Sequence, residues 1–458
     1  MPLRKRLGSG FLGAAFARLW AGFALACSGD GLATGAVPLL AVLVNPHPFA
    51  VSVVAGADTL PWLLVALPGG VVADRFSRGR VMAWANLLRG VMVLLAATLV
   101  STGRLSLVVL VLVVLLNAAL RAVYYSAMQA LTFDLIPPDR LEQANGLLGT
   151  TESGAEHLAG PIAASALFAA GPSIPFFADA AVMVGSGLTF LRLRRPSEGD
   201  AAPDVAEQPA GPLEDSPAAR SSMWEGLRFL FADRRLRVLL FMVSSLAGLQ
   251  GLETGVLVLL ATKEWGVTPA TYGLFLAAGA AGNLVGSAVA AKVAGRYGSA
   301  RALLVAAVLS GAGYLLMASA SDWRVAGPAY FVVGTAVGIG AVVATSMRQR
   351  LTPVDLMGRV GAAWRGITWG AAPAGALAAG LLATVWGLRV PVLFAGILQI
   401  GIAAMLAAPL LRVIGGPPPS LPRSQRARHA RGRLRAPDPD PAHGTGDPAE
   451  VVVGDVGT

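Results

Sequence analysis

The sequence contains little charge and a single cysteine. That cysteine is Cys27, so no disulfide can form within the chain. Asp, Glu, Lys and Arg make up 14% of the 458 residues, whereas soluble globular proteins carry about 25%. The sequence has no G-x-x-x-x-G-K-[ST] phosphate loop, no convincing metal-ligand cluster and no nucleophile–base spacing. These absences give no reason to expect an ATPase, a metal or cofactor site, or an enzyme.

Long apolar stretches dominate the chain instead. Hydrophobic residues make up 55% of it, and its mean hydropathy is +0.64. A soluble chain of this length could not bury so much apolar surface, so we predict an all-α membrane protein. A spanning helix needs roughly 20 apolar residues, which gives about twelve expected spans. They are 17–43, 50–73, 81–101, 105–126, 144–170, 173–192, 236–261, 269–293, 301–320, 325–347, 360–384 and 389–412.

The placement of Lys and Arg predicts the orientation of these spans. With the N-terminus inside, the expected outer loops hold only Arg104, Lys263, Arg324 and Arg389. Cytoplasmic loops normally carry the excess of basic residues, so both termini are expected in the cytoplasm and the protein in the plasma membrane. The net charge of +10 is then mainly a topology signal, and we do not expect a nucleic-acid partner.

The chain contains an internal repeat with an offset of about 220 residues. The matching segments are 30–41 with 250–261, 70–80 with 291–301, and 137–139 with 353–355. Matches in the same order and sense indicate parallel repeats. We predict an N-terminal six-helix lobe (11–195), a cytoplasmic linker (196–222), a C-terminal six-helix lobe (223–412) and a disordered, basic, Pro-rich cytoplasmic tail (413–458).

A compact charged run, GVVADRFSRGR, separates the second and third expected spans. It begins at Gly70, and its charged residues are Asp74, Arg75, Arg78 and Arg80. Such a cluster would not lie in hydrocarbon, so it is expected at the membrane surface. The second copy of the run has Gly295 where the first has an aspartate.

On these residues the chain resembles the major facilitator superfamily over about residues 11–412. The charged run resembles the superfamily's loop motif between spans two and three. Segments 127–130, 136–141 and 144–145, with Gly29-Asp-Gly in the first span, resemble the drug:proton antiporter branch that includes macrolide-efflux and enterobactin-exporter-like proteins. The resemblance implies the major facilitator fold, with twelve transmembrane helices in two parallel six-helix repeats that alternate access to the two sides.

The resemblance also implies a role for the charged run as a cytoplasmic gate. In the family, the loop motif is thought to latch the cytoplasmic side when the cavity faces outward. Carried over here, Asp74 would accept hydrogen bonds from a helix end or a basic partner in the other lobe. Arg75, Arg78 and Arg80 would hold the loop and lipid headgroups. The alternative is a run that only anchors the topology.

The fifth expected span carries a second family-like motif. Gly154 and Gly160-Pro161 resemble the antiporter motif of proton-coupled exporters, although Ala163 and Ala164 stand where further glycine would be expected. A proline frees a backbone carbonyl and small residues allow close helix contact, so a helix bend is predicted here. A bend without any antiporter role is the alternative.

Ionisable residues within the expected spans are the candidate transport site. They are Asp30, Glu152, Glu156 and Glu253, with Arg89, Arg121 and Arg365. Each costs roughly 2.5–3.5 kcal/mol to insert, so each needs a paired or hydrated site. A carboxylate in a low-dielectric cavity holds its proton more tightly than one in water, and can bind and release it as access alternates. Asp30 and Glu156 rank first as proton carriers; permanent ion pairs with Arg89 or Arg121 are the alternative.

The sequence predicts a proton-coupled secondary transporter that exports small organic molecules such as a drug, siderophore or metabolite. Tyr124, Tyr125, Trp364 and Trp369 are candidates to line its cavity. The expected partners are a small-molecule substrate, protons and membrane lipid, and the expected state is a monomer without a cofactor. The alternatives are a proton symporter that imports a nutrient, and a non-transporting membrane sensor or scaffold.

Overall fold

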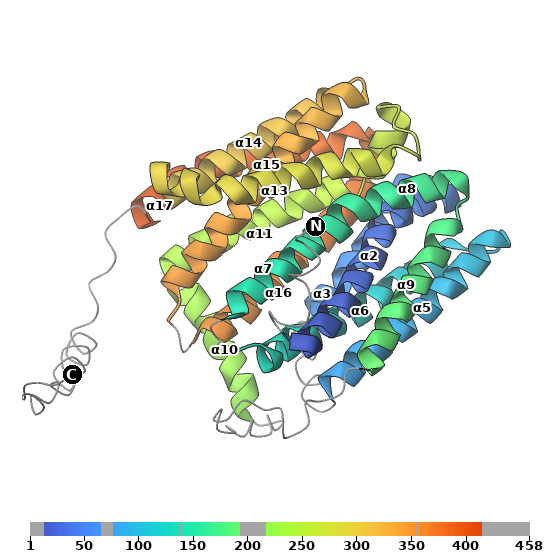
Figure 1. The fold of residues 1–458 in the computed structure, drawn as a ribbon. Helices are drawn as coiled ribbons and strands as arrows, with labels where there is room; N and C mark the ends of the chain where they lie inside the picture. The colour runs from blue at the N-terminus through green and yellow to red at the C-terminus, as the bar shows by residue number, and fades with distance from the viewer. Residues whose placement is uncertain (1–12, 66–76, 138–139, 193–216, 354–355, 415–458) are drawn as a thin grey trace, which may run out of the picture. The chain divides into compact units, whose positions relative to one another are not determined.

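The computed structural model describes residues 13–65, 77–137, 140–192, 217–353 and 356–414, and every regular element in these ranges is helical (Figure 1). The first half contains α2 (Gly13–Val44), α3 (Pro48–Val65), α5 (Arg78–Ser101), α6 (Leu107–Leu135), α7 (Leu141–Glu152), the π-helix η2 (Ser153–Ala159), α8 (Gly160–Ala170) and α9 (Ile174–Leu191). The second half contains α10 (Pro217–Ala232), α11 (Arg234–Thr254), α12 (Leu257–Leu259), the π-helix η3 (Leu260–Glu264), α13 (Tyr272–Tyr297), α14 (Ser299–Ser319), α15 (Trp323–Leu351), α16 (Met357–Trp386) and α17 (Arg389–Ile414).

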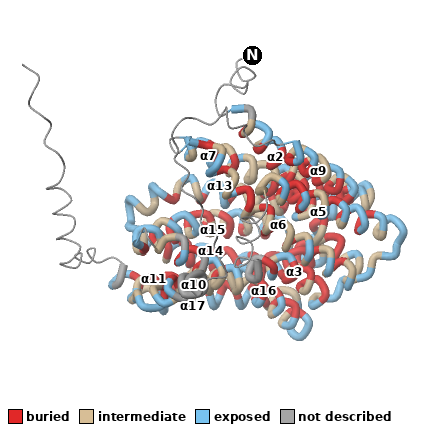
Figure 2. The backbone as a smooth tube through the Cα atoms, turned by 90° about the horizontal axis from the view of Figure 1, so that it is seen from below, coloured by how far each residue is buried: buried red, intermediate tan, exposed pale blue. Residues whose placement is uncertain are grey.

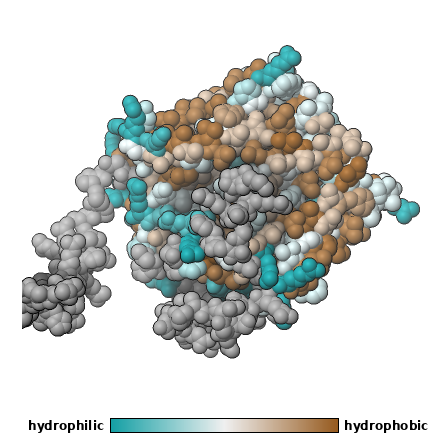
Figure 3. Space-filling model, viewed as in Figure 1, coloured by the Kyte–Doolittle hydropathy of each residue, from teal (hydrophilic) through white to brown (hydrophobic). Residues whose placement is uncertain are grey.

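The all-α membrane fold predicted from the sequence is confirmed. Within the described residues, ten helices are long and apolar enough to cross a bilayer. Two further expected spans are not among these ten. The span 50–73 runs into residues 66–76, which lie outside the described part of the chain. The span 144–170 is divided into α7, η2 and α8. Apolar side chains cover most of the face seen in Figure 3, and hydrophilic ones gather mainly at its margins.

The helices form two groups. Helices α2 to α9 pack against one another and are called the N-lobe, and α11 to α17 do the same and are called the C-lobe. In Figure 1 the N-lobe runs from blue to green and the C-lobe from yellow-green to red. The chain divides into two compact units, 1–415 and 416–458, and both lobes belong to the first. The predicted linker and tail fall mostly on residues 193–216 and 415–458, which lie outside the described residues.

The two lobes touch through α3 with α16 and through α8 and η2 with α13. Small residues allow these approaches: a Cβ atom at Gly273 would lie 2.7 Å from the backbone nitrogen of Ile162. At one end of the lobes, Lys263 Nζ donates a hydrogen bond to the carbonyl of Pro46 over 3.2 Å. These contacts lie toward the helix ends that carry residues 45–47 and 265–271, so the lobes are held together there.

Buried residues, red along the tube in Figure 2, lie mainly toward the inside of the helix bundle. The largest apolar cluster joins the lobes, because it includes Leu40 and Leu110 from the first half and Leu259 and Trp265 from the second. Each lobe also has a cluster of its own. The joined end of the molecule is therefore the end with the more continuous apolar packing.

Candidate functional site

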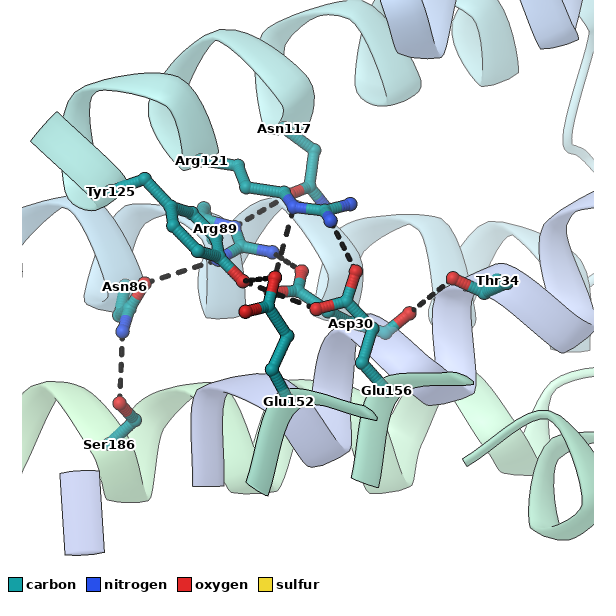
Figure 4. A network of polar contacts seen from close by, with 10 residues as sticks. All are labelled: Asp30, Thr34, Asn86, Arg89, Asn117, Arg121, Tyr125, Glu152, Glu156 and Ser186. Atoms are coloured by element: carbon teal, nitrogen blue, oxygen red, sulfur yellow. Dashed lines mark hydrogen bonds and ion pairs between the residues drawn. The ribbon is translucent and has the colours of Figure 1, made fainter. Parts of the chain in front are cut away.

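Charged side chains from four N-lobe segments meet inside the helix bundle (Figure 4). They are Asp30 of α2, Arg89 of α5, Arg121 of α6 and Glu156 of η2, called here the N-lobe charge cluster. Arg89 donates a hydrogen bond from Nη2 to Asp30 Oδ1, and Arg121 donates one from Nη2 to Glu156 Oε1. Arg121 Nε also lies 3.7 Å from Asp30 Oδ2. Arg121 therefore bridges the two carboxylates.

Arg89 is the fixed arginine of the cluster. Its side chain is 1% exposed. Nε donates to Asn117 Oδ1 over 2.7 Å and Nη1 donates to Asn86 Oδ1 over 3.3 Å. Asn86 in turn donates to Ser186 Oγ over 2.9 Å, and Ser186 donates to the carbonyl of Gly22 over 2.7 Å. This chain of hydrogen bonds fixes the guanidinium from three neighbouring helices.

Arg121 is the accessible arginine of the cluster. Its side chain is 20% exposed, and its guanidinium lies 5.8 Å from the ring centroid of Tyr125. The Tyr125 hydroxyl donates to Glu156 Oε2 over 3.2 Å and lies 3.5 Å from Glu152 Oε1. Tyr125 thus links the buried Glu156 to Glu152.

The π-helix η2 sets the position of Glu156. Pro161 has no N–H and cannot bond to the carbonyl of His157, so the regular α-helical ladder is interrupted there. Gly160 donates instead to the carbonyl of Ala155, five residues back. The sequence predicted a bend at Gly160-Pro161, and the structure places a π-helical turn immediately before it. Such turns are frequent at functional sites.

Glycines bring α2 against this turn. A Cβ atom at Gly31 would lie 2.8 Å from Gly160 Cα, and one at Gly35 would lie 2.9 Å from Pro161 Cα. Real Cβ atoms are not found so close to backbone, so only residues without a side chain fit here. Asp30 is the residue before the first of these glycines. The close crossing therefore brings its carboxylate to the one in η2.

Three adjoining cavities connect the cluster to the space between the lobes. An inner cavity of about 300 Å³ is lined by residues that include Asp30, Asp58, Arg89, Arg121, Tyr272 and Tyr330. A central cavity of about 680 Å³ is lined by residues that include Asp58, Arg121, Tyr125, Glu152, Gln250 and Arg365. A C-lobe pocket of about 420 Å³ is lined by residues that include Gln250, Arg348, Trp364, Arg365, Trp369 and Gln399. These volumes suit a small organic ligand.

The remaining predicted site residues lie in three different places. Glu152 lines the central cavity and reaches the cluster through Tyr125. Arg365 lines the opposite, C-lobe side of the same cavity. Glu253 is 1% exposed in α11 and lines none of these three cavities; its Oε1 has no hydrogen-bond partner within the described residues. It is separate from the N-lobe charge cluster.

The predicted gate is described only in part. Gly70, Asp74 and Arg75 lie outside the described residues. Arg78 forms an ion pair with Asp134 at the end of α6, within the same lobe. Arg80 is exposed near the start of α5. The latch role therefore stays a prediction.

Several polar residues of the site were not identified from the sequence. Asp58 lies in the second expected span and lines both the inner and the central cavity. The insertion-cost argument that selected Asp30 would have selected Asp58 and the buried Asp179 as well. Asn117 is uncharged and gave no such signal. Arg348 directly follows the expected span 325–347, where a basic residue is ordinary, but it lines the C-lobe pocket.

Comparison with known proteins agrees with this architecture. The family model of the Major Facilitator Superfamily matches residues 19–262 and again 250–442. The chain is 27% identical to the multidrug efflux pump Tap of Mycobacterium tuberculosis (strain ATCC 25618 / H37Rv) over 399 residues, 83% of this chain and 91% of that protein. It is 26% identical to the uncharacterized MFS-type transporter YfiS of Bacillus subtilis (strain 168) over 390 residues, 81% of this chain and 87% of the relative.

Solved structures show the same fold at low sequence identity. A bacterial homolog of the human lysosomal transporter Spinster, inward-facing and unoccupied, superposes with a TM-score of 0.66 at 13% identity, covering 89% of this chain and 98% of that one. The nucleoside transporter NupG superposes with a TM-score of 0.64 at 12% identity, covering 86% and 98%. The chain belongs to the Major Facilitator Superfamily and is a membrane transporter rather than an enzyme.

Proposed function

We propose that this transporter exports small organic molecules in exchange for protons, with Asp30 and Glu156 as the proton-binding groups. The observation that carries the proposal is the bridging position of Arg121. This side chain contacts both buried carboxylates and also lines the inner and central cavities. A change in the charge of either carboxylate therefore changes how Arg121 is held in the cavity wall.

The proton and the substrate act through the same guanidinium. When both carboxylates are ionised, Arg121 is held between them. A proton on Glu156 removes the charge that Arg121 faces, and the guanidinium is released toward the central cavity. Arg89 stays with Asp30, because its asparagine partners hold it in place. Proton binding to Glu156 thus changes the charge and the position of a side chain that lines the inner and central cavities.

The arrangement of the lobes fits one step of such a cycle. With the predicted orientation, residues 45–47 and 265–271 lie outside the cell, so the contacts between the lobes close the outer side. The cavities are then reached from the cytoplasm, and the carboxylates are in ion pairs, as expected after the proton has left. Each proton that enters supplies about 2.3 kcal/mol per 100 mV of membrane potential.

The similarity to proteins named as multidrug efflux pumps supports export over import. The protein is proposed to act in the plasma membrane as a monomer with both termini in the cytoplasm. The shape and charge of the cavity walls determine which substrate is bound.

Transport in inside-out membrane vesicles tests direction and coupling together. Ethidium, fluorescein and Nile red would be offered to vesicles with an acidic interior. An exporter coupled to protons concentrates at least one of these dyes inside and loses that activity when an ionophore removes the gradient. Accumulation that occurs only in right-side-out vesicles with an acidic exterior would support the import alternative instead.

Carboxylate variants with a matched control show whether the N-lobe charge cluster couples transport to the proton gradient. Asp30→Asn and Glu156→Gln are expected to abolish gradient-driven accumulation. Glu264→Gln should not, because its carboxylate forms an ion pair with Arg389 at the partly exposed end of the C-lobe. Normal active export by both cluster variants would exclude these residues from the coupling mechanism.

A further inference from the structure

The C-lobe pocket differs in charge from the rest of the cavity system. Its volume is about 420 Å³, and its lining includes Arg348 and Arg365 but no Asp or Glu among the described residues. The inner and central cavities, in contrast, contain both signs of charge. The pocket is therefore lined by positive charge alone, and it adjoins the central cavity, with which it shares Gln250, Arg365 and Trp369.

The two arginines of the pocket converge on one point. A Cβ atom at Gly361 would lie 3.0 Å from Arg348 Nη1 and 3.9 Å from Arg365 Nη1, so both guanidinium groups reach the same place. Neither forms an ion pair with an acidic residue of the described chain, and Arg348 Nε is buried without a hydrogen-bond partner. Two like charges brought together in a partly desolvated pocket repel each other. An anion between them would remove that repulsion.

Aromatic side chains form the neighbouring wall. Arg348 lies over the ring of Trp364 at 5.8 Å from its centroid, and Trp369 also lines the pocket. A planar guanidinium presents paired N–H donors that match carboxylate, sulfonate or phosphate oxygens. Indole rings offer flat apolar faces to a second ring. The wall thus combines donors for an anionic group with surfaces for an aromatic one.

We propose that the C-lobe pocket binds the anionic group of an aromatic organic acid, with Arg348 and Arg365 as its direct ligands. The inference rests on the proposed function, since it names the class of substrate that the export cavity takes. In this scheme the N-lobe charge cluster binds the proton, and the C-lobe pocket binds the negatively charged group of the substrate.

Calorimetric titration of the purified full-length protein in lipid nanodiscs tests this proposal. The probes are naphthalene-2-sulfonate, the neutral 2-naphthalenemethanol and the cationic 2-naphthylmethylammonium. The sulfonate is expected to bind about tenfold or more tightly than the other two. Arg348→Gln and Arg365→Gln should each remove about that advantage, whereas Arg348→Lys should keep part of it because the charge remains.

Arg350→Gln is the matched control. This residue lies on the same helix, is exposed and does not line the pocket. It should leave sulfonate binding unchanged, and elution of all variants as one monodisperse species shows that they are folded. Equal affinity for the three probes, or an equal loss in the control variant, would overturn the proposal.

Nanodiscs of different lipid composition distinguish a pocket that binds an organic acid from one that binds a lipid headgroup. In nanodiscs of phosphatidylcholine alone and in nanodiscs with added phosphatidylglycerol, an organic acid site should bind the sulfonate equally. Complete displacement by the anionic lipid would assign the pocket to a headgroup and contradict the proposal. Binding does not require transport, so a pocket that binds the sulfonate in a protein that moves no protons would refute only the proposed function.

Discussion

Replacing Asp30 by asparagine should destabilise the N-lobe more than replacing Glu156 by glutamine. Both carboxylates are buried, but their arginine partners differ. Arg89 is 1% exposed, and hydrogen bonds to the side-chain oxygens of Asn117 and Asn86 hold it in place beside Asp30. Arg121 is 20% exposed and lines two cavities. Loss of the first carboxylate therefore leaves a buried cation without its counter-charge.

The size of the effect follows from these exposures. Removing one partner of a buried ion pair costs about 3–5 kcal/mol. Asp30→Asn should fall near the lower end, about 3 kcal/mol, because Arg89 keeps two asparagine oxygens and gains the new amide oxygen. Glu156→Gln should cost about 1.5 kcal/mol, the value of one hydrogen bond to a charged group, since Arg121 can turn to the cavity and keep its contact with Asp30.

Equilibrium unfolding in mixed dodecylmaltoside and sodium dodecyl sulfate micelles, followed by circular dichroism, measures this difference. The double variant Asp30→Asn/Arg89→Gln should recover about 1 kcal/mol or more relative to the sum of the single changes, because no unpaired charge remains. Glu264→Gln, an exposed pair, should change stability by less than about 1 kcal/mol. The reasoning is refuted if Asp30→Asn is as stable as the parent, or if the two single changes add without coupling.

Three further predictions concern the surroundings of the cluster. Gly160→Ala should push α2 away from the π-helix and reduce proton coupling several-fold. Gly154→Ala should not, because a Cβ atom there would meet no atom within 4 Å. Equal effects of the two changes in a proton-flux assay would contradict the close-crossing argument. Glu253→Gln should keep full stability in the unfolding assay, since no cation of the described chain pairs with Glu253; a loss above about 2 kcal/mol would show a missed partner. Tyr125→Phe should slow gradient-driven transport a few-fold by removing the hydrogen bond to Glu156, at a cost of about 1 kcal/mol; an unchanged rate would exclude that hydrogen bond from the mechanism.

The sequence predicted the fold well because its strongest signals are collective. Apolar stretches long enough to span a bilayer, and three segments repeated at nearly constant offset, depend on many residues at once. The structure divides two expected spans, 144–170 and 236–261, each with a π-helix, and the first shows where such a pattern is insufficient. Apolar content does not record whether an N–H bonds to the carbonyl four or five residues back, although Pro161 gave a local sign of the interruption.

The candidate site was predicted less completely, for a physical reason. A charge in an apolar span is visible in the sequence, so the sequence predicts Asp30, Arg89, Arg121 and Glu156 as site residues. Which of them meet depends on helix crossings such as the one at Gly31, which a single sequence does not specify. Uncharged partners and residues near span ends were missed: Asn117 has no insertion cost to reveal it, and Arg348 has the position of a topology anchor.

Proton flux through purified protein tests the central claim most directly. Proteoliposomes would contain the pH indicator pyranine and hold an imposed pH gradient. The added substrate would be whichever of ethidium, fluorescein and Nile red accumulates in the inside-out vesicles. We predict that this substrate collapses the gradient for the parent and for Glu264→Gln, and that Asp30→Asn and Glu156→Gln show no substrate-driven flux. Substrate-driven proton flux at the parent rate in both cluster variants would contradict the account.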